Sequence, residues 1–297
     1  MLRLALCALC LLAPLGALAA AATTIRIVAA ENFYGDIAAQ LAGPRARVTS
    51  ILENPSSDPH LFEPDIATAR AVADADLVVY NGLSYDVWMT RLLGSERAPK
   101  RRVVEAASVP GRTARGSNPH LWYDIQTMQA LARAMVASLA QIDPAHRAWY
   151  EQRLDQFLAS LRPITAEIEQ LRGRYAGVPV AATEPIADYL TAAIGLSMRE
   201  QAFQLAEMND TEPSARDTAA FEQALRDRTL RVLIYNPQVT GSAVERLLRI
   251  ARAAGVPIVG MTETEPNGAD YQRWMLAQLR ALDHALSLAP ARPGRQP

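Results

Sequence analysis

Short apolar runs alternate with segments of helical periodicity along most of the chain. The runs that predict strands are residues 25–30, 47–52, 76–81, 102–106, 178–183, 198–201, 232–236 and 257–261. The segments that predict helices between them are residues 32–41, 65–75, 85–93, 186–194, 215–226 and 242–254. Asn32 stands at the start of the first helix, where an Asn side chain can cap free N–H groups. Strands that alternate with helices form mainly parallel sheets covered on both faces, so the pattern predicts an α/β fold.

The middle of the chain carries only helical sequence. One helix is predicted over residues 125–139 and a second over residues 143–175. The apolar stripe of the second helix keeps its phase across Pro163, although proline normally ends a helix. We therefore predict one kinked helix, roughly 50 Å long at about 1.5 Å per residue.

This pattern divides the chain into two lobes joined by the long helix. We expect an N-terminal α/β lobe over residues 23–124, a helical region over residues 125–176 and a C-terminal α/β lobe over residues 177–288. The tail over residues 289–297 contains three prolines and is expected to be loose.

The N-terminus has the pattern of an export signal. An uncharged run ends at Ala22, and its dense apolar part is too short to span a bilayer well. We predict a signal peptide over residues 1–19, with cleavage after Ala19 or as late as Ala22; a retained N-terminal anchor is the alternative. Cys7 and Cys10 are the only cysteines and lie in this segment. The mature protein is therefore expected to be periplasmic and to contain no disulfide.

Composition narrows the class of partner. Lys and Arg number 30, Asp and Glu number 31, and half of the residues are apolar. This is the composition of an ordinary globular protein, and its net charge of −1 gives no electrostatic basis for binding nucleic acid. The sequence contains no H-E-x-x-H, G-x-S-x-G or P-loop motif, which favours a binding protein over an enzyme.

Two of the four histidines stand in matching motifs. Residues 58–62 read Asp-Pro-His-Leu-Phe, and residues 118–122 read Asn-Pro-His-Leu-Trp. Each motif lies in a loop after a strand of the first lobe, where α/β folds place ligands. A proline before each histidine restricts the direction of the imidazole. His60 and His120 are therefore candidate metal ligands.

An acidic residue follows each of these histidines. Glu63 and Asp124 are candidates to accept the second ring N–H of the imidazoles and so to support the metal site from outside. The remaining two histidines, His146 and His284, lie on charged helical stretches and are expected to be solvated, with no role in binding.

The second lobe offers carboxylates at the ends of predicted strands. Glu184 and Glu263 each follow a strand, so both stand at the carboxyl edge of the second sheet, where ligands bind. Glu31 and Glu265 are expected to be solvated loop residues. Two imidazoles and two carboxylates would form a neutral site for a divalent cation.

Several segments resemble the cluster A-I substrate-binding proteins, which are the metal-binding components of bacterial zinc and manganese ABC importers. The matching segments are residues 28–38 (Val-Ala-Ala-Glu-Asn-Phe-Tyr-Gly-Asp-Ile-Ala), the two Pro-His motifs, residues 76–83 and residues 183–190. The resemblance implies two (β/α) lobes bridged by a long helix, with one divalent ion bound between them as the transported ligand. It also implies delivery of that ion to an ABC permease with its cytoplasmic ATPase. We expect the protein to be a monomer.

The resemblance also implies a ligand set. His60 and His120 match the first and second histidines of the family. The third position is histidine in many zinc-type members and glutamate in many manganese-type members, and here it is Glu184. The fourth is usually aspartate, and the matching residue here is Glu263. Because glutamate is one methylene longer than aspartate, the nearby Glu265 is an alternative fourth ligand.

The expected ligands identify a transition metal without selecting one. Two carboxylates make the site harder than a three-histidine site, which suits Mn²⁺ or Fe²⁺, whereas Zn²⁺ stands above Mn²⁺ in the Irving–Williams order. Other functions that fit His and Glu between α/β lobes are a metal-dependent enzyme, such as a hydrolase or a chelatase-like protein, and a metal-binding adhesin. A binder of organic solutes would need aromatic pocket walls, and aromatic residues make up only 6% of the chain.

Overall fold

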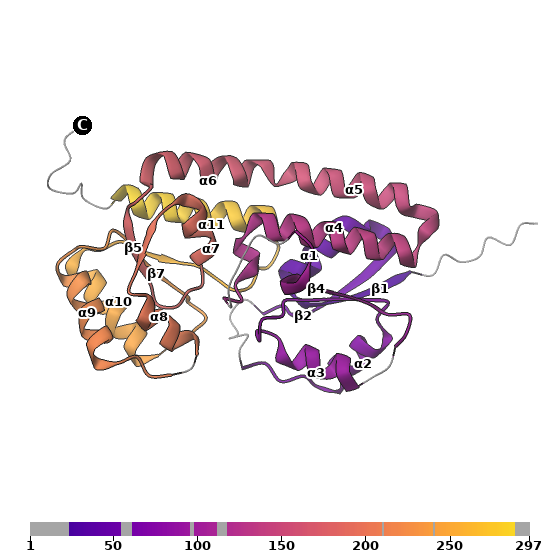
Figure 1. The fold of residues 1–297 in the computed structure, drawn as a ribbon, viewed down its shortest axis with the longest axis horizontal. Helices are drawn as coiled ribbons and strands as arrows, with labels where there is room; N and C mark the ends of the chain where they lie inside the picture. The colour runs from indigo at the N-terminus through magenta and orange to yellow at the C-terminus, as the bar shows by residue number, and fades with distance from the viewer. Residues whose placement is uncertain are drawn as a thin grey trace, which may run out of the picture.

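A parallel four-stranded sheet forms the centre of the N-terminal lobe in the computed structural model, which describes residues 24–54, 61–95, 98–111, 118–209, 211–239 and 241–288. The strands in spatial order are β2 (Ala46–Leu52), β1 (Ile25–Glu31), β3 (Leu77–Tyr80) and β4 (Arg102–Glu105). The helices between them are α1 (Asn32–Ala42), α2 (Ile66–Asp74) and α3 (Val87–Ser95). Helices α2 and α3 lie on one side of the sheet, and α1 lies on the other (Figure 1).

Alternate residues of β1 bury opposite faces of this sheet. Ile27 and Ala29 belong to the large hydrophobic core shared with α1 and with α4 (Ile125–Ile142). Val28 belongs to a smaller cluster with Val72 of α2 and Trp88 of α3. A strand covered on both faces needs apolar residues at consecutive positions, which explains why the first predicted strand reads as an apolar run rather than an alternation.

The C-terminal lobe repeats the same topology. Its strands in spatial order are β6 (Ser197–Arg199), β5 (Pro179–Ala182), β7 (Leu233–Tyr235) and β8 (Ile258–Gly260), all parallel. Its helices are α7 (Asp188–Ile194), α8 (Gln201–Met208), α9 (Ala215–Arg226), α10 (Ser242–Ala254) and α11 (Tyr271–Leu288). The two-lobed α/β architecture predicted from the sequence is therefore confirmed (Figure 1).

The predicted long helical connection joins the lobes, and its kink at Leu161 divides it into two consecutive helices. A short 3-10 turn (Pro144–His146) leads into α5 (Arg147–Ser160), and α6 (Arg162–Tyr175) follows after Leu161. Both run along one side of the two lobes (Figure 1). The break has a local cause, because Pro163 has no N–H to donate and its ring opposes the carbonyl one turn earlier. Leu161 is buried and its carbonyl accepts from the first N–H groups of α6, so the apolar stripe continues across the break.

Several local expectations need correction. No helix is predicted over α8, and for α11 only the stretch around His284 is expected to be helical, although α11 buries Trp274, Leu279 and Leu282. Asn32 does not cap α1: Glu31 holds the N-cap position without a side-chain cap, and the Asn32 amide reaches the other lobe instead. His146 is only half-exposed, and its Nδ1 lies 2.8 Å from Asp143 Oδ2.

Other expectations concern residues outside the described part of the chain. The predicted signal peptide, the tail over residues 289–297 and the loop residue His60 all fall there. Among the helices that the structure does describe, none combines the length and the hydrophobicity needed to cross a bilayer.

Candidate metal site between the lobes

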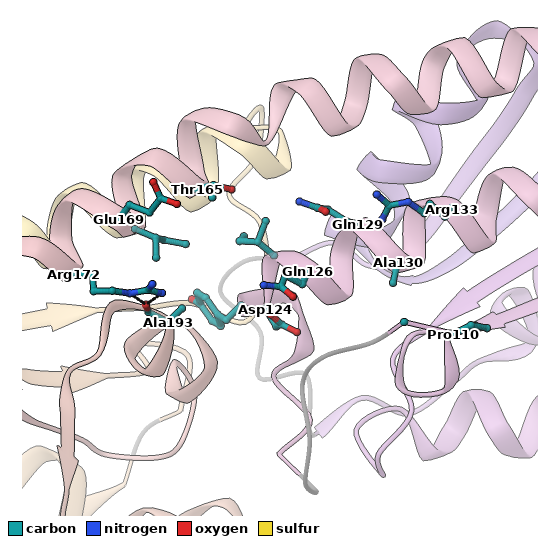
Figure 2. A pocket seen from close by; sticks show the side chains of 14 residues that line it. Pro110, Asp124, Gln126, Gln129, Ala130, Arg133, Thr165, Glu169, Arg172 and Ala193 are labelled. Atoms are coloured by element: carbon teal, nitrogen blue, oxygen red, sulfur yellow. Dashed lines mark hydrogen bonds between the residues drawn. The ribbon is translucent and has the colours of Figure 1, made fainter. Parts of the chain in front are cut away.

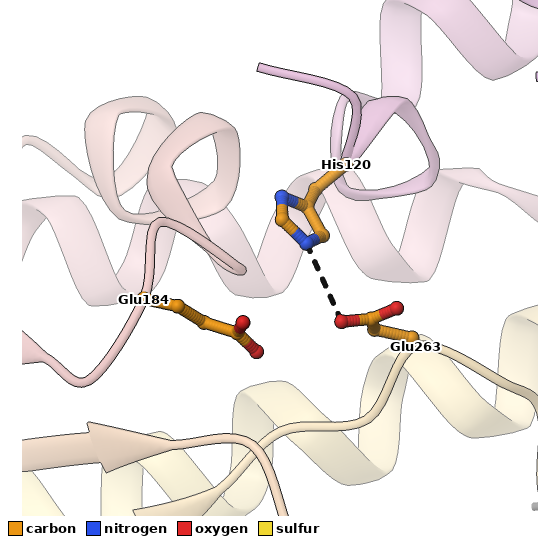
Figure 3. Close-up of side chains that lie close together, drawn as sticks. All are labelled: His120, Glu184 and Glu263. Atoms are coloured by element: carbon orange, nitrogen blue, oxygen red, sulfur yellow. Dashed lines mark ion pairs between the residues drawn. The ribbon is translucent and has the colours of Figure 1, made fainter. Parts of the chain in front are cut away.

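Three of the expected ligands meet between the lobes. His120 comes from the N-terminal lobe, and Glu184 and Glu263 follow β5 and β8 of the C-terminal lobe (Figure 3). Each offers one ligand atom, and these atoms all lie within 4.8 Å of one another. His120 and Glu263 are fully buried, and Glu184 is 5% exposed. The carboxyl ends of parallel strands thus bring together side chains that are up to 143 residues apart, counted from His120 to Glu263.

The imidazole of His120 is oriented by Asn118. Its Nδ1 lies 2.7 Å from Asn118 Oδ1, so Nδ1 carries the proton and donates. The Nε2 lone pair then faces Glu263 Oε1 at 3.6 Å. We expected Asp124 in the orienting position, but its carboxylate accepts from the backbone N–H of Thr127 as the N-cap of α4.

Asn118 also connects the histidine to the opposite lobe. Its Nδ2 donates to Pro185 O at 2.7 Å, and its backbone carbonyl accepts from the Tyr189 hydroxyl at 2.7 Å. Pro185 follows Glu184 directly, in a tight turn closed by the Ile186 N–H donating to Glu184 O. The same amide therefore fixes the direction of His120 and the position of the loop that carries Glu184.

Glu263 is held from both lobes. Its Oε2 accepts from the Tyr85 hydroxyl at 2.7 Å, and its Oε1 accepts from Asn236 Nδ2 at 2.8 Å. Its backbone N–H donates to Gln238 Oε1 at 2.6 Å. A buried carboxylate needs such donors, because its charge would otherwise be costly away from water.

The alternative fourth ligand, Glu265, lies outside this group. Its backbone N–H and C=O both bond to the Asn32 side chain of the other lobe, at 3.0 and 2.7 Å. Burial, and then the charges of Asp36 and Asp270, raise the pKa of Glu265 to about 9. The structure therefore brings Glu263, not Glu265, together with His120 and Glu184. Glu63, the other expected supporting residue, is exposed.

A strained turn presents Tyr85 to the site. Gly82, Leu83 and Ser84 all have left-handed backbone conformations, with φ of 81, 53 and 64°. For residues other than glycine this costs of order 1 kcal/mol each. The buried carboxylate of Asp86 holds the turn, because it accepts from the backbone N–H groups of Asn81 at 2.5 Å and Gly82 at 2.9 Å.

Glu31 and Asp86 are two buried acids near the site that were not expected there from the sequence. Glu31, expected to be solvated, is fully buried at the end of β1, and within the described chain neither of its carboxyl oxygens has a hydrogen-bond partner. Burial, and then the charges of Asp86 and Glu263, hold its pKa well above the usual range. Burial also raises the pKa of Asp86 to about 6. Glu265 was likewise expected to be solvated and is buried.

Direct bonds across the lobes gather near the site. Besides the Asn32–Glu265 pair, the Asp36 carboxylate accepts from the Tyr271 backbone N–H at 3.0 Å, and the Tyr271 hydroxyl donates to Trp122 O at 2.7 Å. These bonds join α1 and the segment after His120 to α11 and the loop before it. The lobes are therefore tied together by side chains as well as by α5 and α6.

A hollow separates the lobes on the side of α6. It has a volume of about 580 Å³, with Gln126, Gln129 and Arg133 of α4 on one wall and Thr165 and Glu169 of α6 on another (Figure 2). At its edge the Arg172 guanidinium donates to Ala193 O at 2.8 Å. The hollow is also lined by Tyr123 and Asp124, so it lies behind the turn that follows His120.

The fold is that of solved metal-binding proteins. The structure of the periplasmic zinc binding protein TroA from Treponema pallidum matches with a TM-score of 0.74 and 20% identity, over 89% of this chain and 99% of that one. The protein FpvC from Pseudomonas aeruginosa, solved in complex with Mn²⁺, matches with a TM-score of 0.72 and 21% identity, over 89% and 98% of the two chains. These likenesses establish the class as two-lobed α/β proteins with this topology.

The chain belongs to the family described as zinc-uptake complex component A, periplasmic, whose model matches residues 27–285. The manganese-binding lipoprotein MntA of Halalkalibacterium halodurans is 28% identical over 144 residues, 47% of each chain, so this chain spans about half of that relative's length. A metal ABC transporter substrate-binding lipoprotein of Lactococcus lactis is 22% identical over 282 residues, 86% of this chain and 87% of the relative. The family consists of transport components rather than enzymes.

Proposed function

We propose that this protein captures one divalent transition-metal ion, Mn²⁺ or Zn²⁺, in the periplasm and delivers it to an ABC permease. The observation that carries the proposal is the buried group of His120, Glu184 and Glu263, whose ligand atoms lie within 4.8 Å of one another. Membership of the zinc-uptake family supports this function over the metal-dependent enzyme and the adhesin considered above. In this proposal the protein acts as a monomer, and the permease works with a cytoplasmic ATPase.

The ligand set is also part of the proposal. His120 offers Nε2, Glu263 offers the oxygen that faces it, and Glu184 completes the group within the described chain. The fourth ligand is His60, which stands in the motif that matches that of His120. Two neutral imidazoles and two carboxylates balance the charge of a divalent cation, which lowers the cost of burying the ion.

Metal analysis and calorimetry test this function. Protein purified without chelator should contain about one transition-metal ion per chain, and the metal-free protein should bind Mn²⁺ and Zn²⁺ at a single site. His120→Ala should weaken binding at least about a hundredfold, because loss of a supporting residue alone typically costs ten- to a hundredfold. His284→Ala replaces an exposed histidine and is the matched control. Equal affinity in both variants would overturn the site.

A further inference from the structure

We propose that Tyr85 is a positioning residue that restricts Glu263 to coordination through one oxygen and thereby sets the preference of the site between zinc and manganese. The inference rests on the proposed function, because it concerns how the same site handles two metals.

The two oxygens of Glu263 have different surroundings. Oε1 lies 3.6 Å from His120 Nε2 and accepts from Asn236 Nδ2, so it is the oxygen that faces the histidine. Oε2 accepts from the Tyr85 hydroxyl at 2.7 Å. An ion bound between His120 and Glu184 would therefore meet Oε1, while Oε2 is held by the tyrosine.

Tyr85 cannot easily swing away from this position. Its side chain is 7% exposed, and its ring lies 5.2 Å from the ring of Trp122, which is itself fully buried. Its backbone N–H donates to Gly82 O at 3.2 Å, so the left-handed turn before it is closed directly onto Tyr85. A Cβ at position 82 would lie 2.2 Å from Glu105 Oε1, so any other residue there would have to displace the Glu105 side chain as well as adopt a φ of 81°.

The hydrogen bond crosses from one lobe to the other. Tyr85 belongs to the N-terminal lobe and Glu263 to the C-terminal lobe, yet both are buried at the same point between them. A donor from the opposite lobe can hold the carboxylate only while the lobes are together. The restriction on Glu263 therefore depends on the contact between the lobes that this structure shows.

Coordination through one oxygen matters because the two metals differ in the number of ligands they prefer. Zn²⁺ in proteins is commonly four-coordinate and tetrahedral, whereas Mn²⁺ takes octahedral surroundings rich in oxygen. Two imidazoles and two single oxygens give four ligand atoms, which suits Zn²⁺. Release of Oε2 from Tyr85 would allow Glu263 to bind through both oxygens, and this fifth ligand atom favours Mn²⁺.

The test compares Tyr85→Phe with Tyr271→Phe. Tyr271 is the matched control, because it is fully buried and its hydroxyl also crosses between the lobes, but to the backbone of Trp122. Competition titrations give the ratio of the Mn²⁺ and Zn²⁺ dissociation constants. We expect Tyr85→Phe to shift this ratio about tenfold toward Mn²⁺ and Tyr271→Phe to leave it unchanged. A general loss of stability would not produce this difference, because it would weaken the binding of both metals by the same factor.

Infrared difference spectra keep the inference testable if Tyr85→Phe fails to fold. They are recorded on the wild type and on Glu184→Gln, in which Glu263 is the one carboxylate left in the proposed ligand set. The separation of the two carboxylate stretching bands is wide for coordination through one oxygen and narrow for coordination through both. Wide separation with both metals in Glu184→Gln supports the inference. Narrow separation in Glu184→Gln, or equal metal ratios in the two tyrosine variants, would overturn it while the proposed function stands. A wild-type protein that binds neither metal would overturn both.

Discussion

The buried carboxyl of Asp86 should make the metal-free protein less stable as the pH rises. Burial raises its pKa from 3.8 to about 6 although two backbone N–H groups donate to it. The folded state therefore holds the proton more tightly than the unfolded state does. The stability that this group contributes is fully present below about pH 4 and is lost as the pH rises through about 6.

The size of the effect follows from the difference between the two pKa values. Between 3.8 and about 6 lie roughly two units, and each unit is worth about 1.4 kcal/mol. The free energy of unfolding should thus fall by about 3 kcal/mol across this range because of Asp86 alone. Asp86→Asn removes the titration, so the difference between wild type and variant isolates it.

Urea denaturation in the presence of chelator, between about pH 4 and 7, measures this difference. The wild type should lose stability relative to Asp86→Asn as the pH rises. Asp65→Asn is the control with the opposite sign, because hydrogen bonds from Thr68 lower the pKa of the exposed Asp65 carboxyl. For Asp65, the free energy of unfolding of the wild type should rise relative to that of Asp65→Asn as the pH rises. If the free energy of unfolding of the wild type stays constant or rises relative to that of Asp86→Asn, the argument that burial of Asp86 outweighs its hydrogen bonds is refuted.

Three further predictions concern metal binding. Glu184→His should raise the preference for Zn²⁺ over Mn²⁺, because a third imidazole softens the site; an unchanged ratio in competition titrations would place Glu184 outside the ligand set. Because His60 and His120 must both be neutral to bind metal, the apparent affinity should fall more than tenfold per unit of pH between about pH 6 and 5; a shallower slope in calorimetry would leave only one histidine in coordination. Metal should cause little rotation between the lobes, because Asn32–Glu265, Asp36–Tyr271 and Tyr271–Trp122 already join them, so a clear compaction in small-angle scattering would contradict this account.

The general plan of the site follows from strand order. Glu184 and Glu263 were chosen because each follows a strand in a parallel sheet, and such positions meet at one edge whatever their separation in sequence. The same argument applies to Glu31, which we expected to be a solvated loop residue but which lies at the end of β1, the second strand of its sheet. A strand-end acid is thus informative even when it also borders a helix.

The residues that support the ligands were harder to predict for two different reasons. Asn118 had a local signal, because a side-chain oxygen two residues before His120 is within reach of Nδ1. We expected the carboxylate of Asp124 in that role instead. Tyr85 had none: its contact with Glu263 joins residues 178 positions apart across the lobes and depends on the left-handed turn before it. Pairings of this kind are set by tertiary packing and leave no periodic trace in the sequence.

The central claim is tested most directly by a crystal structure of the protein grown with Mn²⁺ or Zn²⁺, with the ion located by its anomalous scattering. We predict one ion between the lobes, bound by Nε2 of His120, by Glu184, by Oε1 of Glu263 and by His60, at about 2.0–2.2 Å for zinc. Oε2 of Glu263 should stay with the Tyr85 hydroxyl. An ion bound elsewhere on the chain, with His120, Glu184 and Glu263 outside its coordination shell, would contradict the account.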